Sequence, residues 1–480
     1  MRTSKTHSLR FRAIRAALAA LVLIVLGNAT LSFIFLPYGS KSDIMWTDYY
    51  EQEQIDAVFT GTSLAHRGFN PAVIDEAWGI NTFNMCTPAQ TLEESFNAIK
   101  TAYRDHGITR AVLGTEFAAF QEEKFLYPSS AFFSNKWPHQ DLAGTVQDWI
   151  DILSCPSYWT STNSLNILSP WIYNHVHASP GVVINNVKMK LDGTTLYDAA
   201  EQNEVGWLYF GKGYGNYDVS VESDKNNPIA YFEKYPRTDF TDNRFTVAEQ
   251  ICQFCNENGI ALTVVNMPEP AANVLEYGDM YWTQSNQLKD FFTERGANYY
   301  DFSFIKKQYF AGTPNYFADW QHMNVKGGTA FGIAFVQVVE AAEQGKDTSE
   351  MFYASMDEYR ATIDTITRVN VDARNENDTI TMTLSCIAGS GVHVEYRVLV
   401  WDDAQGGWIE VRGYSPETEV VCAASGGNIT RLRIEARKAG FHADYQRYTE
   451  VNVYRSSDDS TASDDMEILD AGGHHGKKRS

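Results

Sequence analysis

Short apolar runs alternate with longer amphipathic segments along residues 55–343 of this 480-residue chain. The apolar runs have the length and composition of buried strands, and the segments between them have the spacing of helices. The predicted strands cover residues 57–60, 81–85, 111–114, 261–266 and 298–301, and the predicted helices cover 71–78, 91–106, 245–258, 284–294 and 326–343. Strands joined through helices favour a parallel sheet covered on both faces. We therefore predict a flavodoxin-like three-layer α/β domain over residues 45–345.

Two other regions depart from this alternation. Residues 120–240 are rich in aromatic residues, Asn, Gly and Pro, and we interpret them as an insertion in the α/β domain. Their aromatic side chains either form a small core of their own or shape a substrate groove by stacking on sugar rings. Residues 356–456 alternate apolar and polar positions, which predicts an all-β sandwich that is either a spacer or a glycan-binding module. Residues 457–480 are predicted to be a disordered tail.

The first forty residues form a targeting segment. Basic side chains are concentrated in residues 1–15, and residues 16–37 carry no charge. An apolar stretch of about twenty residues is long enough to span a bilayer as a helix. The basic flank predicts a single-pass signal anchor in the cell membrane, with a cytoplasmic N-terminus and everything after about Ser40 outside. The alternative is a cleaved signal peptide, cut near Ala29.

The net charge of −21 argues against one class of partner, nucleic acid. An acidic chain lacks the basic surface that neutralises phosphates, so we expect no nucleic-acid partner. Six cysteines are too few for a disulfide framework, although Cys386 and Cys422 lie in β-patterned sequence and either pair or stay free. Cys252 and Cys255 lack the second pair or nearby histidines of a zinc site. We expect them to be a buried structural pair, and we expect no metal and no cofactor.

Two short motifs carry the candidate chemistry. Ser63 ends the sequence Gly61-Thr62-Ser63, which places it on the turn after the first predicted strand. Asp319 precedes His322 by three residues, before the last predicted helix. At this spacing the aspartate can bond one ring nitrogen while the other takes the proton of a serine hydroxyl. We predict a catalytic set of Ser63, Asp319 and His322; the alternative is that Ser63, and Asp319 or Asn324, only cap helices.

These motifs resemble those of the SGNH (GDSL-like) hydrolase superfamily. Gly61-Thr62-Ser63 stands where that family has its Gly-Asp-Ser block, and Asp319-x-x-His322 stands where it has its last block. The similarity covers roughly residues 50–345 and is greater to a membrane-anchored branch, which includes proteins of teichoic acid D-alanyl transfer and alginate O-acetylation. The resemblance implies an envelope polysaccharide or teichoic-type acceptor, and a multispanning membrane acyltransferase as partner.

The groups that would stabilise the oxyanion follow the same resemblance. The backbone N–H of Ser63 is one donor, and a second is expected from the loop after the second strand. The candidates in that loop are Asn84, Cys86 and Thr87. Typical members also have a Gly-x-Asn-Asp block with a donor Asn, but this chain has Gly114-Thr115-Glu116 at the matching strand end. Glu116 is expected either to bind an acceptor or to cap the next helix.

The sequence therefore predicts a cell-surface serine O-acyltransferase or esterase that works through an acyl-enzyme. The expected acyl group is acetyl, and the expected substrate is the envelope polymer named above. The alternative is a non-catalytic glycan-binding adhesin or scaffold that retains an SGNH-like fold. An intact set of Ser63, Asp319 and His322 favours the enzyme, because a binding protein has no chemical need of all three.

Overall fold

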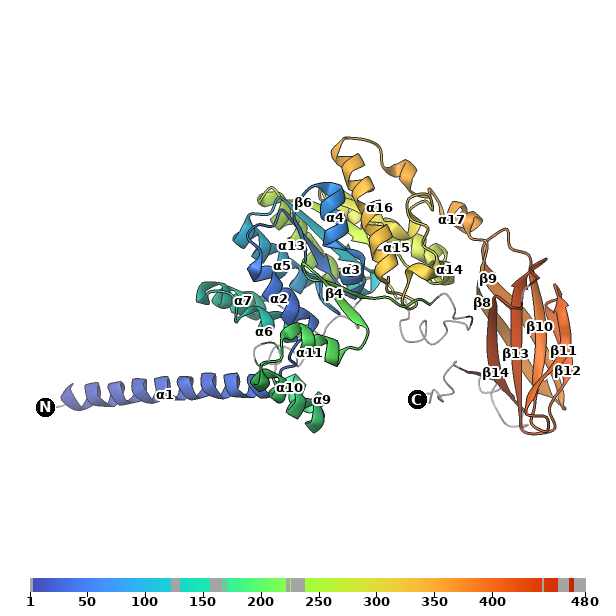
Figure 1. Cartoon of the computed structure of the whole chain (residues 1–480), viewed down its shortest axis with the longest axis horizontal. Coiled ribbons are helices and arrows are strands. Elements are labelled where there is room, and N and C mark those ends of the chain that lie inside the picture. The colour runs from blue at the N-terminus through green and yellow to red at the C-terminus, as the bar shows by residue number, and fades with distance from the viewer. Residues whose placement is uncertain are drawn as a thin grey trace. The chain divides into compact units, whose positions relative to one another are not determined.

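The computed structural model describes residues 3–121, 130–155, 167, 169, 171–221, 225, 238–442, 444–455 and 466–469 (Figure 1). The chain divides into two compact units. The first contains Met1–Asp218, Asp239–Val265 and Arg295–Asn298, and the second contains Val219–Thr238, Asn266–Glu294 and Tyr299–Ser480. The division falls inside residues 45–345, so the extent of the α/β domain stays a prediction.

A parallel five-stranded sheet confirms the α/β class. Its strands are β1 (Ala57–Gly61), β2 (Thr82–Asn84), β3 (Arg110–Thr115), β6 (Ala261–Asn266) and β7 (Asn298–Asp301). The order across the sheet is β2-β1-β3-β6-β7, which in chain order is the 2-1-3-4-5 arrangement of flavodoxin-like sheets. Every residue of β1 is buried, as expected for a central parallel strand that is covered on both faces.

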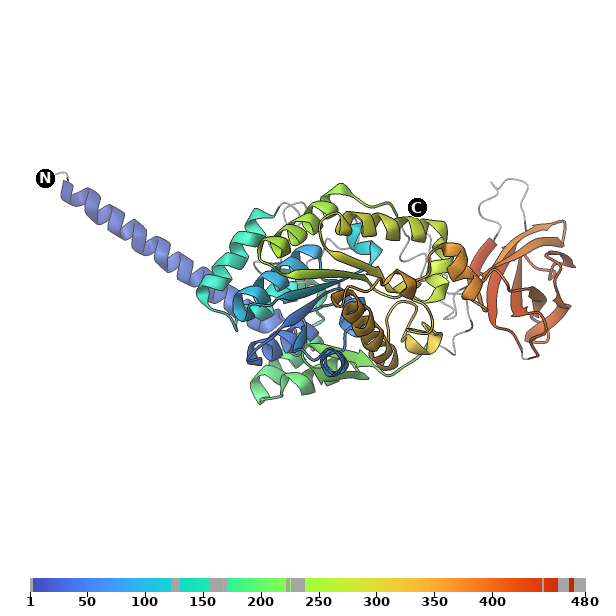
Figure 2. The same cartoon turned by 90° about the horizontal axis from the view of Figure 1, so that it is seen from above.

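Helices lie on both sides of this sheet (Figure 2). In the first unit they are α2 (Lys41–Glu51), α3 (Ser63–Gly68), α4 (Pro71–Trp78), α5 (Leu92–His106) and α13 (Asp242–Glu257). Asn70 caps α4, and Pro71 occupies its first turn, as the sequence predicts. Thr91 and Glu94 form a reciprocal capping box at the start of α5. These local signals fix where the helices that flank β1 and β2 begin.

The described part of the insertion is mainly helical, and up to Asp218 it belongs to the first unit. Its elements are η1 (Phe117–Phe120), α6 (Ser130–Lys136), α7 (Leu142–Ser154), α9 (Trp171–His177), α10 (Pro180–Asp192), α11 (Leu196–Asn203), β4 (Trp207–Gly211) and β5 (Tyr214–Tyr217). Trp207 is buried with Ile44 and Ala200 in a small core, against which Tyr209 and Tyr217 pack. These aromatic side chains therefore serve the insertion's own core.

The N-terminal helix α1 (Thr3–Phe35) carries the apolar segment of the chain. Residues Phe11–Phe35 are long and apolar enough to cross a membrane, and none of the tested window is buried within the described structure. A helix satisfies its own backbone hydrogen bonds, which a membrane-spanning segment requires. The helix therefore fits either a membrane span or a signal anchor, and its orientation stays a prediction.

The α/β part of the second unit carries the segments that follow β6 and β7. They are α14 (Ala271–Tyr277), α15 (Asp279–Thr293), η3 (Phe302–Phe304), η4 (Pro314–Tyr316), α16 (Val325–Glu343), η5 (Ser349–Met351) and α17 (Met356–Thr362). Of these helices, α15 and α16 were predicted from the sequence, although α15 begins at Asp279 and not at the predicted residue 284. Gly278, with a φ of 52°, separates α14 from α15.

The C-terminal part of the second unit consists of antiparallel sheets, as predicted. One sheet contains β12 (Glu419–Ala423), β9 (Thr379–Ala388) and β8 (Ile366–Glu376). The other contains, in spatial order, β11 (Gly407–Ser415), β10 (Val394–Asp402), β13 (Ile429–Lys438), β14 (Arg447–Tyr454) and β15 (Met466–Leu469). Side chains of both sheets, such as Leu384 and Ile434, share one buried core, which is the packing of a β-sandwich.

The structure bears on three smaller expectations, two about the cysteines and one about the C-terminal tail. Cys386 and Cys422 are free thiols, so no disulfide joins them. Cys252 and Cys255 are buried on α13 as predicted, and burial raises the pKa of the two thiols to about 11 and about 12. Residues 466–469 of the tail predicted to be disordered instead form β15, because their backbone pairs with β14. The other residues of 457–480 lie outside the described ranges.

Candidate active site

Ser63 is the first residue of α3 and stands two positions beyond the end of β1. Gly61 closes the strand with a φ of 142°, a conformation that residues with a Cβ rarely adopt. A Cβ at Gly61 would lie 2.0 Å from the carbonyl oxygen of Gly114 on the adjacent strand β3. Thr62, not Ser63, occupies the N-cap position of α3. Ser63 is therefore not the capping residue, and its side chain stays partly accessible on a turn that only glycine permits.

The side-chain amide of Gln90 stabilises the turn between β1 and Ser63 by hydrogen bonds. Gln90 is almost fully buried, and its oxygen accepts hydrogen bonds from the N–H of Gly61 at 2.7 Å and the hydroxyl of Ser95 at 2.9 Å. Its nitrogen donates to the carbonyl of Met85 at 2.8 Å and to the hydroxyl of Thr87 at 3.2 Å. Because both ends of the amide are engaged, Gln90 ties the loop after β2 to the end of β1. The sequence did not identify this residue.

The loop predicted to supply an oxyanion donor is bonded throughout to the protein. The N–H groups of its four residues all donate to oxygen atoms of the first unit. The bonds run from Asn84 to Lys212, from Met85 to Phe59, from Cys86 to the side chain of Asn84, and from Thr87 to Gly61. The Asn84 amide nitrogen also donates to two carbonyls of the α3 region. An oxyanion donor from this loop would require one of these bonds to break, so the roles of Asn84, Cys86 and Thr87 stay untested.

Glu116 lies beside the serine turn but does not cap the next helix. It occupies the N-cap position of η1 without a capping bond from its side chain, which corrects that expectation. Its carboxylate instead accepts a hydrogen bond of 2.5 Å from the hydroxyl of Thr62, the residue before Ser63. An ionised carboxylate only accepts hydrogen bonds. In its ionised form Glu116 therefore cannot replace the donor Asn of the typical third block.

Asp319 and His322 are bonded to each other in the second unit. Ring nitrogen Nδ1 of His322 lies 2.9 Å from Oδ2 and 3.0 Å from Oδ1 of Asp319. An Nδ1–H that donates to the carboxylate leaves Nε2 as a hydrogen-bond acceptor, which is the form a general base needs. The side-chain amide nitrogen of Gln321 lies 3.2 Å from Nε2 of His322 and can donate a hydrogen bond to it.

The environment keeps Asp319 ionised. Partial burial alone would raise its pKa, but the hydrogen bond and charge of His322 oppose this. The N–H groups of Gln321 and His322 donate to the same carboxylate at 2.9 and 2.8 Å. Together these contacts lower the pKa of Asp319 to about 2. The carboxylate can therefore orient the imidazole and stabilise its protonated form at neutral pH.

The tetrad Asp319–His322 lies on a tight loop before α16. A backbone hydrogen bond closes this loop: the N–H of Ala318 donates to the carbonyl of His322 at 2.8 Å. Asn324 caps α16 by accepting the N–H of Gly327 at 2.9 Å, and its own amide donates to two carbonyls. The helix-capping task therefore belongs to Asn324, which leaves Asp319 bonded to the histidine.

Trp320, inside the tetrad, joins the loop to two other parts of the second unit. Its carbonyl accepts a 2.8 Å bond from the buried amide of Asn273, which also bonds Glu269. Its ring lies 4.7 Å from the guanidinium of Arg447, which belongs to β14 of the β-sandwich. Arg447 is itself buried. The sandwich thus contacts the loop that carries Asp319 and His322, which the sequence did not predict.

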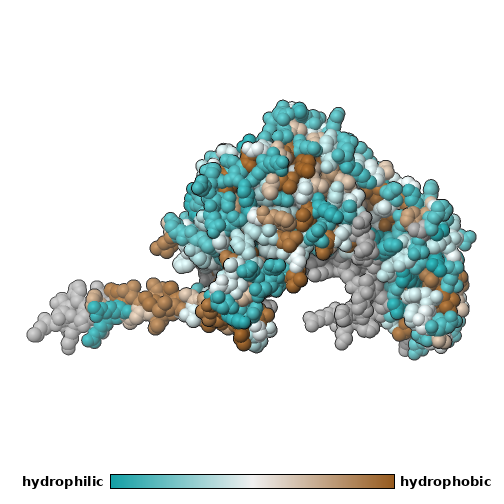
Figure 3. Space-filling model, in the orientation of Figure 1, coloured by the Kyte–Doolittle hydropathy of each residue, from teal (hydrophilic) through white to brown (hydrophobic). Residues whose placement is uncertain are grey.

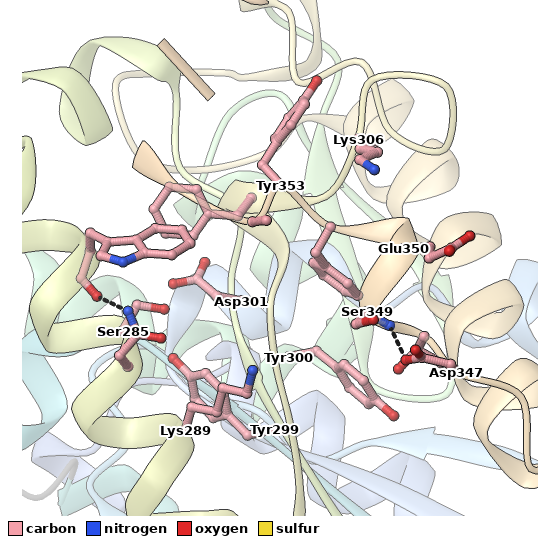
Figure 4. A pocket seen from close by; sticks show the side chains of 16 residues that line it. Ser285, Lys289, Tyr299, Tyr300, Asp301, Lys306, Asp347, Ser349, Glu350 and Tyr353 are labelled. Carbon is pink, nitrogen blue, oxygen red and sulfur yellow. Dashed lines mark hydrogen bonds between the residues drawn. The ribbon is translucent and has the colours of Figure 1, made fainter. Parts of the chain in front are cut away.

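A cavity of about 580 Å³ lies in the second unit near the end of β7 (Figure 4). Aromatic side chains, among them Trp282, Tyr299 and Tyr353, form much of its lining. Asp301 points into this region from β7, and burial raises its pKa to about 6. Neither Asp319 nor His322 lines the cavity. It is therefore a separate feature from the tetrad.

The structure brings some of the predicted site residues together. Asp319 and His322 are bonded to each other, and Glu116 contacts the residue before Ser63. Ser63 belongs to the first unit and His322 to the second, so their pairing stays a prediction. In the ranges that the structure describes, no group of three or more His, Cys, Asp or Glu side chains is arranged to hold a metal ion.

Comparisons with known proteins add little to this description. No family model and no curated protein matches the chain. One similar solved structure is described as a candidate acylhydrolase from Bacteroides fragilis, with 9% identity over 61% of this chain and 92% of that chain, and a TM-score of 0.29. Another is a diltiazem-metabolizing enzyme of a gut microbe, with 8% identity over 75% of this chain and 70% of that chain, and a TM-score of 0.29. Likeness at this level carries no argument about fold or activity.

Proposed function

We propose that this chain is an SGNH-type serine acyltransferase or esterase that is anchored in the cell membrane and acts on an envelope polysaccharide or teichoic-type polymer. The observation that carries the proposal is the bond between Asp319 and Nδ1 of His322, at 2.9 Å. This bond sets the ring tautomer and leaves Nε2 able to accept a proton. The glycine-dependent turn that presents Ser63 supports the same assignment.

The reaction uses Ser63 as nucleophile and His322 as base. Oγ of Ser63 attacks the acyl carbonyl while Nε2 of His322 takes the hydroxyl proton. The tetrahedral intermediate collapses, the bond to the leaving alcohol breaks, and His322 returns the proton to that alcohol. A sugar hydroxyl or water then attacks the acyl-enzyme, and His322 again accepts and returns one proton. Asp319 stabilises the imidazolium in both halves of the reaction.

The surroundings of Ser63 favour transfer over rapid hydrolysis. Glu116 stands where typical relatives supply an Asn donor, and loss of one oxyanion donor costs roughly 10²–10³ in turnover. A slow reaction with water would let the acyl group wait on Ser63 until a sugar hydroxyl arrives. The apolar helix α1 and the resemblance to the branch of teichoic acid and alginate modification proteins support an acceptor in the envelope. A multispanning membrane acyltransferase would deliver the acyl group.

A fluorophosphonate probe tests the proposal directly. The full chain in detergent is treated with the probe, and the modified residue is found by peptide mass spectrometry. We expect one adduct on Ser63, none after Ser63→Ala, and an undiminished adduct after Ser390→Ala, because Ser390 is an exposed serine of the sandwich. An unmodified Ser63 in folded protein that still binds envelope glycan would refute the enzyme and support the non-catalytic adhesin.

A further inference from the structure

Two helices of the insertion cover the last turns of the apolar helix α1. The indole of Trp171 on α9 donates a 2.8 Å hydrogen bond to the side chain of Asn28. The ammonium of Lys190 on α10 donates to the carbonyls of Phe33 and Leu36, at 2.6 and 2.7 Å. These carbonyls belong to the end of α1, where the helix leaves them without intrahelical partners. α1, α9 and α10 all belong to the first compact unit (Figure 1).

Apolar side chains of α9 and α10 are exposed. Val176 on α9 is 68% exposed, and Ile184 and Leu191 on α10 are 69% and 73% exposed. Ile184, Lys188 and Leu191 are spaced i, i+4 and i+7, so they lie along one side of α10, whereas Asn186 and Met189 on the other side are buried. Hydrophobic side chains gather on α1 and beside its C-terminal end (Figure 3). Exposed valine, isoleucine and leucine are costly in water.

The contacts with α1 set the depth of these two helices. An α-helix rises about 1.5 Å per residue, so the contacted segment from Asn28 to Leu36 is about 12 Å long. It overlaps the end of the apolar segment Phe11–Phe35. When α1 spans a bilayer, groups that touch this segment must lie where the acyl chains meet the headgroups. Tryptophan and lysine, the residues that make the contacts, are favoured at that level.

We propose that α9 and α10 lie in the bilayer interface at the C-terminal end of α1, with Val176, Ile184 and Leu191 among the lipid acyl chains. Lys190, which bonds the last carbonyls of the helix, lies nearest the headgroups, and the long side chain of Lys188 extends toward them. The occupant of the exposed face is the phospholipid surface, because α1 itself brings that surface to the face. The inference does not depend on the reaction of the site, and would hold for a binding protein with the same anchor.

Photocrosslinking of the full chain in phosphatidylcholine/phosphatidylglycerol vesicles tests the proposal. p-Benzoyl-phenylalanine replaces Ile184 or Leu191 in separate preparations and Val421 in the control, since Val421 on β12 is 67% exposed. We expect lipid adducts at Ile184 and Leu191 and none at Val421. Crosslinks from the two α10 positions to a second copy of the chain or to another membrane protein, without lipid adducts, would overturn the proposal.

Hydrogen exchange supplies a test that does not need the unnatural residue. Amides of α9 and α10 should exchange more slowly when the full chain is in vesicles of the same composition than in their absence. The double variant Ile184→Asn, Leu191→Asn should lose this protection, while Val421→Asn keeps it and α1 stays protected in all three proteins. Equal exchange of α10 with and without vesicles in the parent would show that the helix lies in water.

Discussion

The turn at Ser63, in the first unit, and the loop of Asp319 and His322, in the second, are built by different means. Around Ser63 the shape comes from buried, closely packed groups: Gly61 touches β3 so closely that no Cβ fits, and the buried Gln90 side-chain amide is bonded at both ends. Around His322 the shape comes from a partly exposed loop, where Asp319 keeps about half of its side-chain surface exposed. Substitutions of the groups that shape the Ser63 turn, such as Gly61, should therefore alter folding, and substitutions of Asp319 or His322 should mainly alter chemistry.

The largest effect is expected from His322→Ala. Without the base, Ser63 keeps its proton, and acyl transfer should fall on the order of 10⁴-fold or more. The loop around His322 is also closed by backbone bonds, so the melting temperature should fall only modestly, through loss of the bond to Asp319. Activity assays and thermal melts check both statements, with His393→Ala on the exposed surface of the sandwich as control. A variant that keeps its activity would remove His322 from the mechanism.

Asp319→Asn should also act through chemistry, with a loss of roughly 10³–10⁴-fold in turnover, because an amide cannot stabilise the imidazolium. Its effect on stability should depend on pH. The pKa of Asp319 is lowered from 3.8 to about 2, so the carboxylate contributes stability above pH 3.8 and loses it as the pH falls through 2. Urea unfolding at pH 7 and at pH 2 measures this: the difference between parent and variant should shrink in acid. A constant difference would show that the charge of Asp319 is not what stabilises the loop.

Gly61→Ala should differ from the two substitutions above, because it should lower the stability of the folded protein. Any loss of activity should accompany that loss of stability. The new Cβ would meet the carbonyl oxygen of Gly114, and strain of this kind costs about 3 kcal/mol or more. Gly79 is the matched control, since its φ of 72° is also positive but nothing lies near its Cβ position. Gly79→Ala should cost only about 1–2 kcal/mol. Equal losses in the two variants, measured by urea unfolding, would contradict the close approach of β1 and β3.

The smallest effect is expected from Arg447→Ala. The guanidinium lies over Trp320, and a partly buried contact of this type is worth about 1 kcal/mol, which corresponds to a several-fold change in rate. If the contact positions the tetrad, turnover should fall while the Michaelis constant stays constant, and Arg447→Lys should recover part of the rate. Arg455→Ala, which breaks an exposed ion pair with Asp378, is the control. A change in melting temperature without a change in turnover would assign Arg447 to the sandwich alone.

The difference between local contacts and contacts distant in sequence explains which features could be predicted from the sequence. The five strands and the start of α4 follow from local patterns, such as the apolar run at β1 and the pair Asn70 and Pro71. The Asp319–His322 bond follows from spacing within a few residues. Gln90 could not be found in this way, because two of its partners, the N–H of Gly61 and the carbonyl of Met85, are backbone groups that meet only in the folded sheet. Arg447 and Trp320 are 127 positions apart, and no local pattern links them.

The short strand β15 has a consequence for how the chain is handled. It comes from the end of the sequence and lies at the edge of its sheet, where it pairs with β14. A protein shortened to residue 455 would leave the N–H and C=O groups of β14 without these partners along one side. Exposed strand edges are templates on which other chains add. Such a truncated protein should self-associate through its sandwich, so affinity tags belong after the last residue and never in place of this segment.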